Sequence, residues 1–152
     1  MAALFDTTVG ILLLRRKQPP ETVPLIRAAK SEIERGSALL PAMAVTELVL
    51  GERDPAGSGR LSAALAKIPT AVLPAEAARD AGAMGSFLRA EGAPIPVPDL
   101  LIAATAVWLG LPLLTWDGDY ARSRERALAG RSPHRGAELW KTLVLHSASR
   151  GA

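Results

Sequence analysis

Short apolar runs alternate along the chain with longer segments in which apolar residues recur at helical spacing. Each run is only a few residues long and is closed by a polar residue, a proline or a glycine, which is typical of buried strands. The runs predict strands at Ala2–Phe5, Ser37–Leu40, Thr70–Leu73, Leu113–Thr115 and Leu143–Leu145. Because predicted strands and helices alternate with short connections, the pattern predicts an α/β domain with a mainly parallel sheet.

The segments between the runs predict helices, several of which have recognisable ends. Thr7 and Thr8 offer a start for a helix over Val9–Arg16, and Gly36 ends an amphipathic helix over Thr22–Arg35. Further helices are expected at Met43–Gly51, Leu61–Lys67, Ala75–Glu91 and Asp99–Leu109, and from about Asp119 onward, with loops at Asp54–Gly59 and Ala93–Pro98.

Two acidic residues stand directly after predicted strands. Asp6 follows the first apolar run, and Asp117 follows the run that ends at Thr115. Parallel sheets place ligands beyond the carboxyl ends of their strands, so both acids are expected at the functional edge. Each also has a structural reading, because Asp6 could cap the next helix and Asp117-Gly118-Asp119 could be an ordinary polar turn.

Two further acids lie in apolar sequence. Glu47 is surrounded by Ala44–Leu50, where only Thr46 is also polar, and Asp99 opens an almost wholly apolar helix. A buried charge is costly unless it is paired, hydrogen-bonded or bound to a metal. At a helix start Asp99 would also gain ~0.3–1 kcal/mol from the macrodipole, whereas capping does not explain Glu47.

Gathered carboxylates indicate a hard divalent cation, because Mg²⁺ and Mn²⁺ prefer oxygen ligands. Without a cation such a group repels itself, and with one it can polarise a phosphate and lower the pKa of a bound water. The chemistry implied is hydrolysis of a phosphodiester by in-line attack of water.

Length and composition exclude several classes of protein. The chain has 152 residues, of which 49% are hydrophobic and 4% aromatic, so one domain spanning residues 1–152 is expected. The absence of cysteine excludes a disulfide framework, a cysteine zinc site and a thiol nucleophile. The apolar start at Met1–Leu14 is followed by Arg15, Arg16 and Lys17, the reverse of a signal peptide, so a cytoplasmic protein without a membrane partner is expected.

The net charge of +3 includes five arginines between Arg122 and Arg135. They could form a solvated surface, or they could contact phosphates, since guanidinium forks bind phosphate oxygens in pairs. The candidates for contact with an RNA backbone are Arg122, Arg124 and Arg126.

Four segments resemble, in order, the motifs of PIN-domain proteins. Phe5–Thr8 is similar to the first motif, and Val45–Leu48 followed by Gly51 is similar to the second. Pro98–Ala106 closely matches the third, and Leu114–Tyr120 resembles the fourth. Beyond Tyr120 the resemblance fades, and the remaining chain is longer and richer in arginine than a compact PIN domain needs.

The resemblance implies a PIN-like three-layer sandwich, with helices on both faces of the sheet. For a chain of this length it implies a VapC-type toxin: an endoribonuclease that needs Mg²⁺ or Mn²⁺, forms a homodimer and is inhibited by a VapB-type antitoxin. Asp6, Glu47, Asp99 and Asp117 are then the catalytic acids. The metal ligands come from Asp6, Asp99, Asp117 and Asp119, and either acid of the Asp117–Asp119 turn could supply the fourth acid.

Thr7 and Thr115 are candidate hydroxyls for orienting a carboxylate or a water, although capping and strand-end hydrogen bonding are equally open to them. Two other functions remain open. One is a non-catalytic PIN-like module that binds RNA or protein, and the other is a housekeeping RNA-processing nuclease without an antitoxin.

Overall fold

Five parallel strands form the central sheet of the computed structural model, which describes residues 2–147. The strands are β1 (Ala3–Phe5), β2 (Ala38–Pro41), β3 (Thr70–Ala71), β4 (Leu113–Thr115) and β5 (Leu145–Ser147), in the order β3-β2-β1-β4-β5. Every neighbouring pair is parallel, so the predicted parallel sheet is confirmed. Residue 1 and residues 148–152, the ends of the expected domain, lie outside the described residues.

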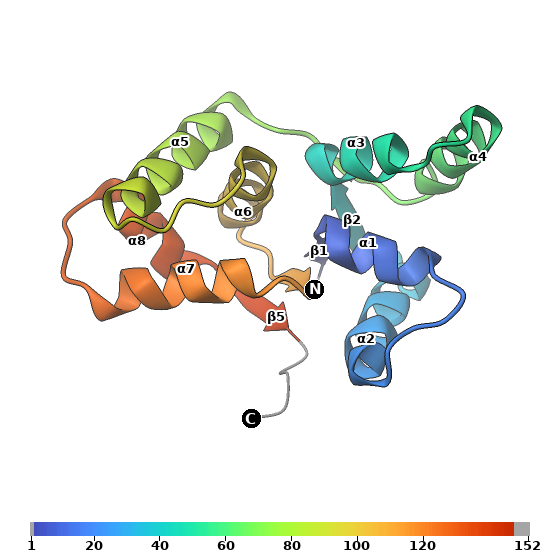
Figure 1. Cartoon of the computed structure of the whole chain (residues 1–152), viewed down its shortest axis with the longest axis horizontal. Helices are drawn as coiled ribbons and strands as arrows, with labels where there is room; N and C mark the ends of the chain where they lie inside the picture. Colours follow the sequence, from blue (N-terminus) through green and yellow to red (C-terminus); the bar gives the residue numbers. More distant parts are fainter. Residues whose placement is uncertain (1, 148–152) are drawn as a thin grey trace.

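Helices connect the strands and cover both faces of the sheet. They are α1 (Thr7–Leu14), α2 (Val23–Glu34), α3 (Ala42–Gly51), α4 (Pro55–Leu65), α5 (Ala75–Ala90), α6 (Val97–Leu109), α7 (Gly118–Ala129) and α8 (Arg135–Thr142), with a 3₁₀ turn at Pro20–Thr22. Figure 1 shows α1 to α4 gathered on one side of the molecule and α5 to α8 on the other. Within residues 2–147 no helix is both long and apolar enough to span a membrane.

The strands supply apolar residues to a separate core on each face. Leu4 and Leu113 pack with residues of α5, α6, α7 and α8. Their neighbours Phe5 and Leu114 pack with residues of α1, α2, α3 and α4. This alternation is the period of two that a strand imposes, and it explains why strands buried on both faces read as continuous apolar runs.

One predicted loop is wrong. The segment Asp54–Gly59 was expected to be irregular because it contains proline, serine and two glycines, but helix α4 begins at Pro55 and runs through it. Asp54 is the N-cap, and its carboxylate accepts a hydrogen bond from the Gly57 amide. Proline in the first turn of a helix costs nothing, because its missing N–H would have no partner there. Pro55 therefore helps to start the helix.

The C-terminal part also differs from the sequence-based expectation. Helix α8 was not predicted, and the last strand lies at Leu145–Ser147 and not at Leu143–Leu145. The helix is held by Trp140, which is fully buried and donates its indole N–H to the Met84 carbonyl over 3.2 Å. His134 caps the start of α8, where its Nδ1 accepts the Gly136 amide.

Gly136 is expected to tolerate no side chain. A Cβ at this position would lie 2.0 Å from the Ala83 carbonyl oxygen in α5, and backbone cannot move aside as a flexible side chain can. We expect Gly136→Ala to lower the free energy of unfolding by about 3 kcal/mol or more, as overpacking of a tight contact does.

Gly82→Ala is the matched control, because a Cβ there meets nothing within 4 Å. In the middle of α5 it should raise the unfolding free energy by roughly 0.5–1 kcal/mol. Urea denaturation of both variants tests the contact. Equal stabilities would show that α5 and α8 do not pack as described.

Candidate metal centre

Acidic side chains meet at the carboxyl edge of the two central strands. Asp6 directly follows β1, and Asp117 lies two residues after the neighbouring strand β4. The strand order reverses at β1, because β1 has β2 on one side and β4 on the other. Parallel sheets bind ligands beyond the carboxyl ends of their strands at such a reversal. Helices α3 and α6 contribute the other two predicted acids, Glu47 and Asp99.

Three of the acids converge closely. Asp99, Asp117 and Asp119 each offer a carboxylate oxygen, and these oxygens lie within 4.8 Å of one another. This three-aspartate cluster combines the first turn of α6 with the turn that opens α7. Both acids of the Asp117–Asp119 turn therefore face the same site, and the Asp117 carboxylate also caps α7 by accepting the Asp119 amide over 2.9 Å.

Asp6 lies beside the cluster and is held by hydrogen bonds from two sides of the chain. Its carboxylate accepts the Thr8 hydroxyl at 2.6 Å and the Val9 amide at 3.0 Å, and so caps α1. The Thr115 hydroxyl donates to its other oxygen. The side chain is 1% exposed, and this burial raises its pKa to about 6 although the hydrogen bonds oppose the shift.

The capping role foreseen for Asp6 is thus real, and it does not remove the residue from the site. The charge of Asp117 also raises the pKa of Asp6, which shows that the two carboxylates are near each other. Asp6 is not part of the three-aspartate cluster among residues 2–147, although it was expected to be a metal ligand. Its position suits it to orient the cluster through Thr115, whose hydroxyl accepts the Asp117 amide at 2.9 Å.

Glu47 is supplied by α3 and lies near Asp99. Its Oε1 accepts the Thr7 hydroxyl at 2.6 Å, a contact between residues 40 positions apart that joins α3 to the start of α1. Glu47 is half-buried, and its charge contributes to the raised pKa of Asp99. Both candidate hydroxyls thus donate to a carboxylate, Thr7 to Glu47 and Thr115 to Asp6.

The electrostatics of Asp99 show how crowded the site is. Partial burial raises its pKa to about 6, with added contributions from the negative charges of Asp117, Glu47, Asp6 and Asp119. The Tyr120 hydroxyl lies 3.4 Å from Asp99 Oδ1, and burial together with the surrounding acids raises the pKa of this phenol. Tyr120 therefore stays protonated and donates to Asp99.

The donor set fits a hard divalent cation. Its ligands would be carboxylate oxygens only, which is the preference of Mg²⁺ and Mn²⁺. The mutual repulsion that raises the pKa of Asp99 is the repulsion that a bound cation would relieve. Asp99, Asp117 and Asp119 are the residues placed to hold it.

Two residues at the site were not identified as site residues from the sequence. Thr8 donates to Asp6 and accepts the Trp116 amide at 2.9 Å, so it ties the end of β1 to the end of β4. Tyr120 was noted only as part of a motif. Their closeness in sequence to predicted site acids could have identified them, because Thr8 lies two residues after Asp6 and Tyr120 directly follows Asp119.

The three arginines proposed for RNA contact do not lie together. Arg122 forms an ion pair with Asp119, and Arg122 and Arg126 line one hollow beside it. Arg124 lies between them in the sequence and does not line that hollow. Its Nε is buried and has no hydrogen-bond partner among residues 2–147. Helical spacing explains the separation, since residues two apart face different directions.

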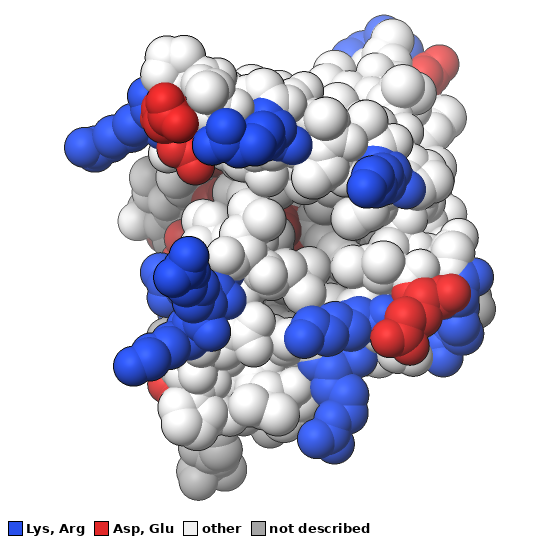
Figure 2. All heavy atoms as spheres, turned by 90° about the vertical axis from the view of Figure 1, so that its right-hand side faces the viewer, with Lys and Arg blue, Asp and Glu red and all other residues white. Residues whose placement is uncertain are grey.

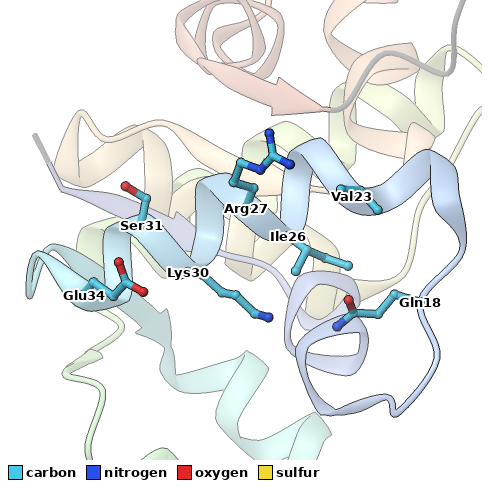
Figure 3. Close-up of a pocket in the computed structure, with 7 residues that line it drawn as sticks. All are labelled: Gln18, Val23, Ile26, Arg27, Lys30, Ser31 and Glu34. Atoms are coloured by element: carbon cyan, nitrogen blue, oxygen red, sulfur yellow. The ribbon is translucent and has the colours of Figure 1, made fainter.

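Another hollow lies elsewhere, between α2 and the connector that follows α1 (Figure 3). Its volume is about 360 Å³, and Ile26, Lys30 and Gln18 are among the residues that line it. None of the clustered acids lines this hollow.

On the face of the molecule that carries α1 to α4, acidic atoms are visible within a recess and Lys and Arg side chains lie around it (Figure 2).

The raised pKa of Asp6 predicts how the stability of the metal-free protein depends on pH. In the unfolded chain this group titrates near 3.8, and in the folded protein near 6, so between these values the folded state binds more protons. The free energy of unfolding should therefore fall as the pH rises from 4 through 6.

Asp6→Asn keeps the shape of the side chain and the oxygen that accepts from Thr8 and Val9, but it carries no charge and no acceptor for the Thr115 hydroxyl. We expect this variant to exceed the wild type in unfolding free energy by about 2 kcal/mol near pH 7.5, because two pKa units correspond to about 3 kcal/mol and loss of the acceptor for Thr115 costs about 1 kcal/mol. Urea denaturation in EDTA at several pH values measures the difference. An asparagine variant less stable than the wild type near pH 7.5 would show that burial of the charge is not costly.

No protein-family model matches the sequence, and no curated protein matches it. Solved structures do match. The chain is similar to a chain of VapBC2 from Rickettsia felis bound to a promoter DNA fragment, with 16% identity, a TM-score of 0.68 and 97% and 98% of the two chains covered. It is equally similar to a chain of VapBC-1 from nontypeable Haemophilus influenzae, at 18% identity, a TM-score of 0.68 and 99% and 100% coverage.

A third match is a chain of VapBC-5 from Mycobacterium tuberculosis, a member of the VapBC family of toxin-antitoxin systems. The identity is 20%, the TM-score is 0.60, and 96% and 98% of the two chains are covered. At such identities the likeness shows the fold. The three-layer α/β sandwich that the PIN resemblance implied is therefore confirmed.

Proposed function

We propose that this protein is an endoribonuclease that uses Mg²⁺ or Mn²⁺ to hydrolyse phosphodiester bonds of RNA. The observation that carries the proposal is the three-aspartate cluster at the carboxyl edge of the parallel sheet, flanked by Asp6 and Glu47. These five acids come from four separate segments of the chain, the four PIN-like motifs, and Asp117 and Asp119 share the last of them. A structural role alone does not call for so many like charges in one place, since each raises the cost of ionising its neighbours.

In this mechanism Asp99, Asp117 and Asp119 would hold the cation, which would neutralise phosphate charge and lower the pKa of water. Tyr120 fixes one oxygen of Asp99 by donating a hydrogen bond to it. Asp6 and Thr115 fix the end of β4 and so the direction of Asp117.

Glu47 is assigned the proton transfer. The Thr7 hydroxyl occupies Oε1, and Oε2 has no hydrogen-bond partner within residues 2–147. This free oxygen accepts a proton from the attacking water, and the Thr7 hydrogen bond holds the carboxylate in place while it does so. Such a positioned base contributes about 10²–10⁴-fold to the rate of a reaction.

We further propose that the enzyme is the toxin of a toxin–antitoxin module. This rests on its structural likeness over nearly the whole chain to chains of VapBC complexes, one of them described as a toxin-antitoxin system. A VapB-type antitoxin would then bind and neutralise it, and a homodimer is expected from the same resemblance. Analytical ultracentrifugation of the purified chain, alone and with the antitoxin, measures both associations.

Expression in growing cells tests the toxin assignment separately from the chemistry. Wild-type protein should arrest growth, and co-expression of an antitoxin encoded beside it should restore growth. Cleavage of RNA in vitro without any growth arrest would instead support a housekeeping nuclease. Binding of RNA without cleavage under any divalent cation would support a non-catalytic module.

A further inference from the structure

Two arginines of α7 line a hollow that shares a residue with the three-aspartate cluster. Arg122 and Arg126 are four residues apart and so lie on the same face of the helix. The hollow has a volume of about 210 Å³, and Asp119, Ser123 and the segment 93–95 complete its lining. Because Asp119 belongs both to this hollow and to the cluster, the hollow lies directly beside the candidate metal centre.

Arg122 contacts one acid of the three-aspartate cluster directly. Its guanidinium forms an ion pair with Asp119, and it lies against the backbone of Gly118, where a Cβ would come within 2.6 Å of Nη1. The arginine side chain is 70% exposed, and ion pairs of such exposure contribute only ~0.2–1 kcal/mol. The contact is therefore specific in geometry but weak enough to be exchanged.

Arg126 stands at the same hollow without such a contact. It is exposed, and it forms no ion pair in the part of the chain that the structure describes. A guanidinium remains charged at every physiological pH and offers paired donors that match two oxygens of a phosphate. The free arginine thus supplies a fixed positive charge next to the cluster.

A divalent cation held by the three-aspartate cluster would compete with Arg122 for Asp119. The cation needs the carboxylate as a ligand, and its two charges repel the guanidinium that already occupies it. An Arg122 released from Asp119 would still lie at the rim of the hollow, one helical turn from Arg126.

We propose that Arg122 and Arg126 form a subsite for an RNA backbone phosphate next to the one that is cleaved, and that Arg122 exchanges Asp119 for this phosphate when a divalent cation binds. The inference rests on the proposed ribonuclease function and specifies how its substrate is held. It also couples binding of the cation to binding of the RNA, because a cation at the metal centre would free Arg122 to bind the RNA phosphate.

Titration calorimetry with Mn²⁺ alone, without RNA, tests the competition. Arg122→Gln should bind Mn²⁺ about twofold to fivefold more tightly than the wild type, which corresponds to the energy of an exposed ion pair. Arg122→Lys retains the charge and should show the wild-type affinity. Arg79→Gln removes an exposed charge from α5 and is the control that should change nothing.

The salt dependence of RNA binding tests the phosphate contacts. Binding of a short single-stranded RNA is measured in a Glu47→Gln background, which slows cleavage and leaves the three-aspartate cluster intact. Each lost phosphate contact should reduce the slope of log K against log salt by about 0.7. With Mg²⁺ both Arg122→Gln and Arg126→Gln should show this reduction, and in EDTA only Arg126→Gln should.

The outcomes separate this inference from the function on which it rests. If wild-type protein cleaves RNA but Arg122→Gln changes neither the Mn²⁺ affinity nor the slope in Mg²⁺, the subsite is wrong and the ribonuclease stands. An equal effect of Arg122→Gln with Mg²⁺ and in EDTA would overturn the exchange. If the wild type cleaves no RNA with any divalent cation, the proposed function fails and the subsite fails with it.

Discussion

Asp99→Asn is expected to reduce the rate of metal-dependent RNA cleavage by about a hundredfold to a thousandfold, the effect of removing one electrostatic contact to the reacting group. Asparagine has the size of aspartate and keeps an oxygen for the Tyr120 hydroxyl, so the fold should persist. What it lacks is the negative charge that makes Asp99 a ligand in the three-aspartate cluster. The variant should also bind Mn²⁺ more weakly in titration calorimetry.

Glu76→Gln is the matched control for this substitution. Glu76 is an acid in the first turn of α5, as Asp99 is in the first turn of α6, so both variants lose the same favourable interaction with a helix dipole. Cleavage by Glu76→Gln should equal that of the wild type. A similar loss of cleavage in both variants, or wild-type cleavage by Asp99→Asn, would mean that Asp99 only stabilises the start of α6.

Glu47→Gln should lower cleavage by at least about a hundredfold, as expected for a general base, while the affinity for Mn²⁺ changes little. The two effects separate because Glu47 lies outside the three-aspartate cluster but next to Asp99. Glutamine still accepts the Thr7 hydroxyl, so the geometry of the contact is kept while the proton acceptor is lost.

Thr7→Val distinguishes the base from the group that positions it. Valine has the shape of threonine without the hydroxyl, and we expect a loss of about tenfold in cleavage, typical of a group that orients another. Measuring kcat and KM for both variants on a short RNA checks this, since kcat should carry the loss in each. A Glu47→Gln variant that loses Mn²⁺ binding in parallel with cleavage would identify Glu47 as a ligand and contradict its assignment.

The positions of Asp6 and Asp117 could be predicted from the sequence because they depend on strands alone. Both acids follow apolar runs, and parallel strands end at one edge of the sheet. The convergence of Asp99 with Asp119 could not be derived in this way. It depends on how α6 and α7 are placed around β4, which no local pattern in the chain specifies.

The errors in the predicted fold have similar causes. Gly57 and Gly59 suggested a loop, but the capping carboxylate of Asp54 and the proline after it outweigh the low helix propensity of glycine. Helix α8 has only eight residues, and its stability comes from burial of Trp140 and from the close approach of Gly136 to α5. Such tertiary contacts leave little trace in an eight-residue pattern.

Cleavage mapping on total RNA tests the central claim most directly. Purified protein is incubated with RNA in Mg²⁺ or Mn²⁺, and the new ends are located by sequencing, with EDTA and Asp99→Asn samples alongside. The account predicts discrete cuts that need the cation and are absent from both comparison samples. RNA left intact with either cation, or cuts that persist in EDTA or with Asp99→Asn, would contradict it.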